Sequence, residues 1–257
     1  MTCLLLDIGN SRLKWATSQN KMDISAQTCF DYRQDDLLQY AEHVWSDILV
    51  DSIWISSVAA PSVYHSIYAW FKHKFGVEAL LLRTPKQGVS VRLAYDVPEK
   101  LGSDRWAGME AAYAVSHDAV LVVSCGTAIT LDVVDRQGMH KGGYICPGIG
   151  LMQNAVQAGT SAIKNVVADF LEAPYLGTTT DSCVQSGVLM AVISLIRSTW
   201  NQARDEMNLQ PVLWITGGDA EYIVSHLVGL PVRYDPALVL NGVALIAASN
   251  YSDRVNK

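Results

Sequence analysis

Residue types that suit phosphate chemistry gather near the N-terminus, in the run Asp7-Ile8-Gly9-Asn10-Ser11-Arg12-Leu13-Lys14. Asp7 ends an apolar stretch, Gly9 follows in a predicted turn, and Lys14 lies on the returning stretch. A glycine turn lets backbone N–H groups approach phosphate oxygens, and an ammonium group can lie against the same charge. A carboxylate at the end of a strand can also hold magnesium through its water shell. The alternative is a plain hairpin that turns at Gly-Asn and leaves Lys14 exposed.

Two further glycine turns lie in the second half of the chain. Gly126-Thr127-Ala128 follows an apolar stretch and can embrace the same phosphates. The run from Ile215 to Ala220 follows a predicted strand and precedes a predicted helix, so its glycines would admit a flat ligand such as adenine. The alternative is a plain strand-to-helix connection with Asp219 as a helix cap. Neither GxxxxGK[ST] nor GxGxxG is present, so a P-loop or Rossmann site is not supported.

A carboxylate and a guanidinium are neighbours in the run LGSDRW at residues 101–106. Asp104 suits deprotonation of an alcohol, and Arg105 suits binding of an anionic substrate. The alternative is that Ser103 or Asp104 only caps the helix that follows. The run GGYICPG at 142–148 is interpreted as a flexible loop or a turn between strands. The six histidines are dispersed and suggest no metal site.

An internal repeat organises the chain. Residues 4–11 (LLLDIGNS) match residues 121–128 (LVVSCGTA), and residues 53–57 (IWISS) match residues 213–217 (LWITG). Two matches in the same order predict two related α/β halves that meet near His117. We therefore expect domains at 1–116 and 117–257.

Hydrophobic periodicity predicts alternating strands and helices, which implies sheets covered by helices. Strands are expected at 3–7, 12–17, 52–57, 78–82, 119–124, 128–134 and 212–216. Helices are expected at 35–45, from Pro61 onward, at 104–114, near 150–159, at 181–203 and after Pro236.

Composition narrows the class of protein. Half of the 257 residues are hydrophobic and 17% are charged, which supplies a core and excludes a mainly disordered chain. The net charge is 19 − 25 = −6 and no basic run occurs, which disfavours nucleic-acid binding.

Cysteine usage and the N-terminus predict the compartment. The five cysteines are scattered without a CxxC pair, which argues for a reducing environment and against a thiolate zinc site. The N-terminal residues lack a basic start and a long apolar stretch, and we find no run of about 18 apolar residues elsewhere. We expect a cytoplasmic protein without a membrane segment.

Taken together, these motifs resemble the type III pantothenate kinase family over essentially the whole chain. The resemblance depends on DIGNSRLK at 7–14, Tyr95 with LGSDRW at 101–106, CGTAITLD at 125–132, GGYICPG at 142–148, and Gly177-Thr178-Thr179-Thr180. It implies a duplicated ribonuclease-H-like (actin-like ATPase) fold, an α/β fold of two mixed-sheet halves flanking a nucleotide cleft. The implied reaction transfers the γ-phosphoryl group of ATP to the primary alcohol of pantothenate, the first step towards coenzyme A.

The resemblance also implies residue roles, with Asp104 as the general base. The ATP-binding residues would be Asp7, Ile8, Gly9, Asn10, Ser11, Arg12, Leu13, Lys14 and Thr127, with Asp7 also placing magnesium. The pantothenate-binding residues would be Tyr95, Gly102, Ser103, Asp104, Arg105 and Thr180. Family members are typically homodimers that use potassium or ammonium.

One position departs from the family pattern. The family's second phosphate turn begins with an aspartate, in the pattern DxGTA, whereas this chain has Ser124. A hydroxyl cannot supply the charge of a carboxylate at the monovalent-cation position. The leading hypothesis is an active kinase, and the alternative is a weakened kinase-fold regulatory protein that binds the same ligands. A third hypothesis is a kinase of the same fold whose substrate is a sugar or an acid other than pantothenate.

Overall fold

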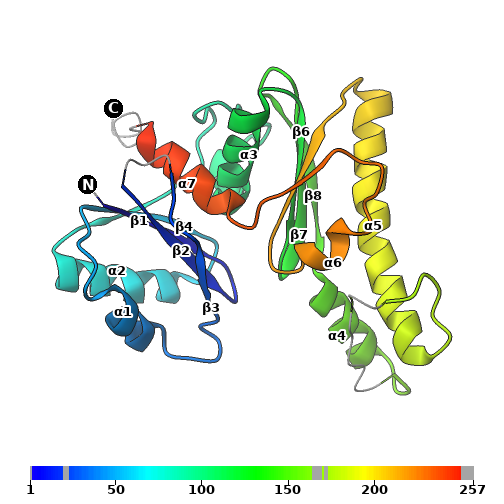
Figure 1. Ribbon diagram of the computed structural model, residues 1–257, viewed down its shortest axis with the longest axis horizontal. Helices are drawn as coiled ribbons and strands as arrows, with labels where there is room; N and C mark the ends of the chain where they lie inside the picture. Colours follow the sequence, from blue (N-terminus) through cyan, green and yellow to red (C-terminus); the bar gives the residue numbers. More distant parts are fainter. Residues whose placement is uncertain (1, 20–22, 164–169, 171–172, 250–257) are drawn as a thin grey trace. The chain divides into compact units, whose positions relative to one another are not determined.

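The computed structural model describes residues 2–19, 23–163, 170 and 173–249 (Figure 1). The chain divides into two compact units. Unit 1 comprises residues 1–115 together with 237–257, and unit 2 comprises residues 116–236.

Unit 1 contains a five-stranded mixed sheet in the order β3-β2-β1-β4-β5. β2 runs antiparallel to both β1 and β3, whereas β1, β4 and β5 run parallel. The strands are β1 (Cys3–Ile8), β2 (Leu13–Ser18), β3 (Thr28–Phe30), β4 (Ser52–Ser57) and β5 (Ala79–Leu81). The helices are α1 (Leu37–Trp45), α2 (Pro61–Phe75), the 3₁₀ turn η1 (Pro98–Lys100), α3 (Ser103–Ser116) and α7 (Leu238–Ala248).

The local sequence explains where the helices of unit 1 begin. The Asp36 carboxylate accepts hydrogen bonds from the N–H groups of Leu38 and Gln39 at 2.8 and 2.9 Å, which caps α1. Pro61 opens α2, where its missing N–H costs nothing. α2 begins at Pro61 as the sequence predicts, whereas α1 begins two residues after the predicted start at 35.

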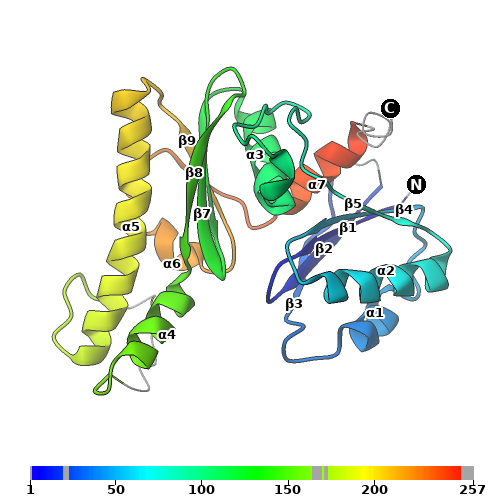
Figure 2. The ribbon, with the colours of Figure 1, turned by 180° about the vertical axis from the view of Figure 1, so that it is seen from behind.

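The two faces of the first sheet have different partners. Leu4, Leu6 and Ile8 belong to a buried cluster with residues of α1 and α2, and these helices lie on one face of the sheet in both ribbon views (Figures 1 and 2). Side chains alternate along a strand, so Asp7 must point to the opposite face. α7 packs against β1, β2 and β4.

Unit 2 repeats the same topology in a second five-stranded sheet, in the order β10-β9-β6-β7-β8. Its elements are β6 (Val120–Cys125), β7 (Ala128–Val134), β8 (His140–Pro147), α4 (Ile149–Gly159), α5 (Thr180–Glu206), β9 (Val212–Thr216), α6 (Ala220–Val224) and β10 (Val232–Tyr234). β6 pairs antiparallel with β7 and parallel with β9, as β1 does with β2 and β4. The predicted correspondence of β1 with β6 and of β4 with β9 is therefore confirmed.

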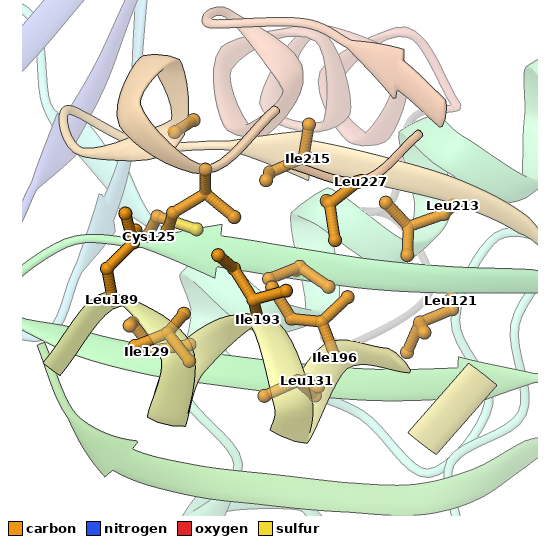
Figure 3. Close-up of a cluster of buried hydrophobic side chains, with 14 of the residues drawn as sticks. Leu121, Cys125, Ile129, Leu131, Leu189, Ile193, Ile196, Leu213, Ile215 and Leu227 are labelled. Carbon is orange, nitrogen blue, oxygen red and sulfur yellow. The ribbon is translucent and has the colours of Figure 1, made fainter. Parts of the chain in front are cut away.

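The core of unit 2 lies between its sheet and α5 (Figure 3). Leu121 and Leu131 from the sheet pack with Leu189, Ile193 and Ile196 of α5. Among the described helices, α5 alone is long and apolar enough to cross a membrane by length and composition. The buried apolar residues of α5 belong to this core, and the core helix of a soluble protein can have the same length and composition.

Two features differ from the sequence prediction. Residues 142–148 are interpreted from sequence as a flexible loop or a turn between strands, but most of them belong to β8, which pairs with β7 at the sheet edge. The C-terminal helix α7 belongs to unit 1 because it packs on β1, β2 and β4. The expected boundary near residue 117 coincides with the start of unit 2, whereas unit 2 ends at residue 236.

Candidate active site

Three polar residues lie side by side at the ends of the central strands of unit 1. Asp7 on β1 is directly opposite Lys14 on β2 and directly opposite Ser56 on β4. Residues directly opposite each other on paired strands point to the same face. Lys14, Asp7 and Ser56 therefore form one row on the face away from α1 and α2, which we call the Asp7 row.

Asp7 supplies the carboxyl group of this row. Its Oδ1 atom is sealed from solvent and has no hydrogen-bond partner among the described residues. The pKa of Asp7 is raised to about 7, chiefly by burial and also by the charge of Asp104, although Lys14 and a hydrogen bond from Ser56 act to lower it. A buried carboxyl with an unused oxygen is suited to a cation that supplies the missing positive charge.

The start of α3 is fixed to the Asp7 row by hydroxyl groups. Ser103 Oγ accepts a hydrogen bond from the N–H of Ser57 at 3.2 Å and lies 3.0 Å from Ser56 Oγ. Thr84 Oγ1 donates to the carbonyl of Leu101 at 2.9 Å. These bonds place the first turn of α3, and with it Asp104, beside the sheet end.

Asp104 and Arg105 diverge from this helix start. Asp104 Oδ1 accepts the N–H of Arg105 at 2.8 Å, and a Cβ atom at Gly102 would lie 2.4 Å from that oxygen. A side chain at 102 would therefore force the Asp104 carboxylate to move. Arg105 Nη1 donates to the Tyr95 hydroxyl at 3.0 Å, and its guanidinium lies 5.8 Å from the centre of the Tyr95 ring. The structure thus brings Tyr95, Gly102, Ser103, Asp104 and Arg105 together within unit 1.

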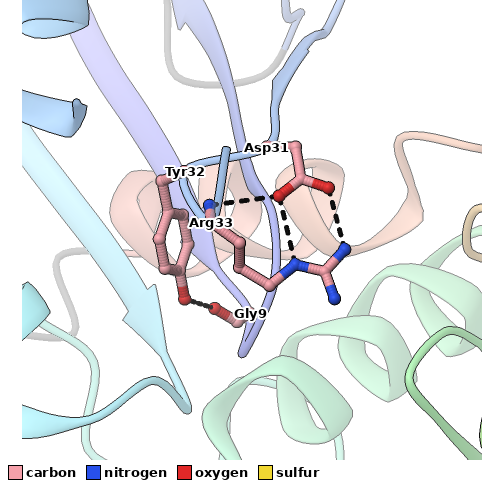
Figure 4. A network of polar contacts seen from close by, with 4 residues as sticks. All are labelled: Gly9, Asp31, Tyr32 and Arg33. Atoms are coloured by element: carbon pink, nitrogen blue, oxygen red, sulfur yellow. Dashed lines mark hydrogen bonds and ion pairs between the residues drawn. The ribbon is translucent and has the colours of Figure 1, made fainter. Parts of the chain in front are cut away.

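The turn between β1 and β2 has its own supports. The N–H of Gly9 donates to the carbonyl of Arg12 at 3.0 Å, and the Tyr32 hydroxyl donates to the carbonyl of Gly9 (Figure 4). Asn10 and Arg12 are exposed, and Ser11 is buried.

Two predicted members of the ATP-binding run cannot reach a ligand by their side chains. Ile8 and Leu13 are 0% exposed and belong to the cluster beneath α1 and α2. They can contribute only backbone groups to a ligand.

Unit 2 carries a corresponding row made of hydroxyl groups. Ser124 on β6 lies opposite Thr130 on β7 and opposite Thr216 on β9. Thr216 is 1% exposed, and its Oγ1 atom has no hydrogen-bond partner among the described residues. This Ser124 row contains no carboxylate.

The predicted turn at Gly126-Thr127 follows the Ser124 row. Thr127 is exposed, its carbonyl accepts the N–H of Gly148 at 2.9 Å, and the carbonyl of Cys125 accepts the N–H of Asp219 at 3.0 Å. Gly217 has φ +102°, and a Cβ atom there would lie 2.2 Å from the Cys125 carbonyl oxygen. Glycine at 217 therefore serves close backbone packing against this turn.

Thr180 begins α5, next to the cap residue Thr179. It lines a cavity of about 510 Å³ in unit 2, with Ile163, Gly177, Thr178, Thr179, Cys183 and Val184.

Sequence reasoning missed several residues that support these groups. Ser56 entered only as part of the repeat, and Tyr32 gave no signal because it follows a three-residue edge strand. Glu110 was also missed. Its buried carboxylate accepts the N–H groups of Val89, Ser90 and Val91 and the indole N–H of Trp106. An acidic residue on an otherwise apolar helical stretch was the available signal.

Comparison with known proteins decides the family. A family model described as type III pantothenate kinase matches residues 3–202. This chain belongs to the type III pantothenate kinase family. A type III pantothenate kinase from Nitrosococcus oceani is 33% identical over 251 residues, which cover 95% of this chain and 93% of that protein.

Solved structures agree with the fold of this family member. A Baf family transcriptional activator from Campylobacter jejuni has a TM-score of 0.59 at 21% identity, covering 97% of this chain and 99% of that one. An activator of 2-hydroxyisocaproyl-CoA dehydratase from Clostridium difficile, solved with ADPNP, has a TM-score of 0.58 at 10% identity, covering 100% and 97%. At these identities the likeness shows the fold alone. The predicted duplicated actin-like ATPase fold is confirmed.

Proposed function

We infer that this protein transfers the γ-phosphoryl group of ATP to the primary alcohol of pantothenate, the first step of coenzyme A synthesis. We assign the substrate and the reaction from membership of the type III pantothenate kinase family. The observation that carries the mechanism is the placement of Asp104, at the start of α3, close enough to Asp7 to raise the pKa of that carboxyl. Phosphoryl transfer depends mainly on positioning and charge stabilisation, and this corner of unit 1 offers both.

The ATP-binding residues we propose are the run from Asp7 to Lys14 and, in unit 2, Thr127. Lys14 lies in the Asp7 row, so its ammonium is placed to stabilise phosphate charge. The Asn10 N–H in the Gly9 turn, which has no acceptor among the described residues, adds a neutral donor. Ile8 and Leu13 fix the strands that flank this turn.

Asp104 is the proposed general base, which accepts the alcohol proton as the new P–O bond forms. Arg105 is the proposed partner of the pantothenate carboxylate, because a guanidinium binds a carboxylate through two parallel hydrogen bonds. Tyr95 orients that guanidinium. Gly102, Ser103 and Thr180 complete the proposed pantothenate contacts.

A kinase of this fold uses ATP with a divalent metal ion, and we propose magnesium at Asp7. The buried, unpartnered Oδ1 of Asp7 fits this assignment because it needs a positive partner. When bound, magnesium offsets the charge on the phosphates. For the monovalent cation that the family uses, the Ser124 row supplies only neutral oxygens, so we expect weak dependence on potassium or ammonium.

The regulatory alternative is not favoured, because Asp7, Lys14 and Asp104 are all present and lie in one corner of unit 1. We further propose that the protein forms a homodimer and acts in the cytoplasm.

The test is ADP release from ATP with pantothenate and with a panel of other alcohols, including sugars and hydroxy acids. We expect release that depends on pantothenate, together with a product heavier by one phosphoryl group. ADP release with another alcohol but not with pantothenate would contradict the substrate, and no release with any acceptor would favour the regulatory alternative.

A further inference from the structure

Tyr32 reaches the Gly9 turn from the other side of the first sheet. It follows β3, it is half-buried, and it packs against the cluster beneath α1 and α2. Its hydroxyl donates to the carbonyl of Gly9, as Figure 4 shows. The Asp7 row faces the opposite side of the same sheet.

The bond from Tyr32 fixes the peptide plane between Gly9 and Asn10. In a trans peptide the carbonyl of one residue and the N–H of the next point in opposite directions. Because the Gly9 carbonyl points to Tyr32, the Asn10 N–H points away from Tyr32. The structure gives this N–H no acceptor among the described residues, so it is available to a ligand.

The preceding peptide plane is also held. The carbonyl of Ile8 accepts the N–H of Val58 at 3.0 Å, and the N–H of Gly9 donates to the carbonyl of Arg12 at 3.0 Å. Among the described residues, the Tyr32 hydroxyl is the one donor to the carbonyl of the plane between Gly9 and Asn10. A glycine beside this plane makes it easy to rotate unless it is held.

We propose that Tyr32 is a positioning residue for nucleotide binding: by holding the Gly9 carbonyl, its hydroxyl aims the Asn10 N–H at a phosphate oxygen of ATP. This inference rests on the proposed function, which assigns ATP to the Gly9 turn. Tyr32 itself touches no substrate in this scheme. Its hydroxyl holds the Asn10 N–H in place before ATP binds. The free energy of binding is then not reduced by the cost of ordering the turn.

The neighbouring pair Asp31–Arg33 supports the position of Tyr32. The Arg33 guanidinium donates to both carboxylate oxygens of Asp31, at 3.1 and 2.8 Å. This pair joins the two residues on either side of Tyr32 (Figure 4). The pair is exposed on the arginine side, so we assign it a minor role.

The experiment compares Tyr32→Phe with the parent and with Tyr40→Phe. Tyr40 belongs to the same cluster, and its hydroxyl accepts the Trp15 indole N–H at 2.9 Å without touching the Gly9 turn. Binding of a non-hydrolysable ATP analogue with magnesium is measured by calorimetry on the full chain. KM for ATP, KM for pantothenate and the unfolding temperature are measured in parallel.

For Tyr32→Phe we expect the Kd of the analogue and KM for ATP to rise about tenfold, the order expected for one neutral hydrogen bond. KM for pantothenate should stay within about twofold. Tyr40→Phe should bind the analogue like the parent even if its unfolding temperature falls further.

Three outcomes would overturn the inference, and they are distinguishable. Equal analogue binding by Tyr32→Phe and the parent would remove the positioning role and leave the proposed function standing. Equal losses in Tyr32→Phe and Tyr40→Phe would assign the effect to general destabilisation. A parent that binds no analogue would overturn the proposed function itself.

Discussion

At the scale of single residues, Asp7 combines burial, a nearby like charge and an unused oxygen. Folding places this carboxyl where its charged form is disfavoured, and Lys14 and Ser56 only partly compensate. Such an arrangement lowers the stability of the empty protein and favours a bound cation. The loss of stability caused by Asp7 is therefore linked to the feature that favours binding of a cation.

This arrangement predicts the pH dependence of stability. The folded protein holds the Asp7 proton up to a pKa of about 7, whereas an unfolded aspartate loses it near 3.8. Folding thus binds a proton between these values, and the Asp7 contribution to stability falls as pH rises through them. Asp7→Asn should be more stable than the parent by about 1–3 kcal/mol above pH 7, and the gap should close below pH 4.

Denaturant unfolding in EDTA without nucleotide, at intervals from about pH 3 to about pH 8, measures this gap. Asp47→Asn, at an exposed aspartate on another part of unit 1, is the matched control and should show no such trend. A gap for Asp7→Asn that does not change with pH would mean that the pKa of Asp7 is near its ordinary value.

Some site residues could be predicted from sequence and others could not. Asp7, Lys14 and Asp104 lie in short runs whose residue types already indicate phosphate chemistry. Ser56 and Tyr32 lie far from these runs in sequence and reach the site only through strand register and a bond across the sheet. Single-sequence patterns do not encode such long-range pairings.

At the scale of elements, the segment before Tyr95 is held to α3 by Glu110. Glu110 is 0% exposed, and its carboxylate accepts the N–H groups of Val89 and Ser90 at 2.8 Å each. Burial raises the pKa of Glu110, although the bonds it accepts lower it. α3 also carries Asp104 and Arg105, so one helix positions the proposed base and the loop that leads to Tyr95.

Glu110→Gln should therefore weaken both the fold and acceptor binding. The amide replaces one acceptor oxygen with a donor that faces backbone N–H groups, which should cost about 1–3 kcal/mol of stability. KM for pantothenate should rise several-fold, with KM for ATP unchanged. Glu99→Gln, at an exposed glutamate in η1, is the control for both measurements. Equal KM values for pantothenate in the parent and Glu110→Gln would show that Glu110 has a structural role alone.

The predictability of elements follows their length and their ends. α1 was predicted because apolar residues recur at helical spacing within 35–45, and α2 because Pro61 can open a helix. β3, β5 and β10 have three residues each, which is too short for a periodic pattern. β5 was found from its apolar run, whereas β3 and β10 were missed. β8 is glycine-rich and mostly exposed at a sheet edge, so it resembles a loop in sequence.

At the scale of the whole chain, the two repeated halves have sheets of the same topology but different polar residues at matching positions. Asp7 and Ser124 occupy the same place in β1 and β6, and Ser56 and Thr216 occupy the same place in β4 and β9. The repeat was visible in sequence because both strand pairs are apolar and end in similar turns. The assignment of α7 to unit 1 was not, since an apolar helix shows no sign of which sheet it covers.

The difference between the two rows predicts the effect of Ser124→Asp. A carboxylate at 124 adds a full negative charge beside the buried, unpartnered Thr216 hydroxyl, which favours a monovalent cation. The parent should show at most a weak rise of initial rate with potassium, and Ser124→Asp a steeper one, at fixed ionic strength. If the parent depends on potassium as strongly as Ser124→Asp does, position 124 does not control cation use.

The central claim is that Asp104 accepts the proton of pantothenate during transfer from ATP. The most direct test is kcat for formation of phosphorylated pantothenate by Asp104→Asn and by the parent, with analogue binding measured on both. Our account predicts a fall in kcat of roughly 10²–10⁴-fold, the range expected for loss of a general base, with analogue binding retained. Turnover of pantothenate by Asp104→Asn at the parent's rate would contradict it and leave Asp104 as a residue of the helix start.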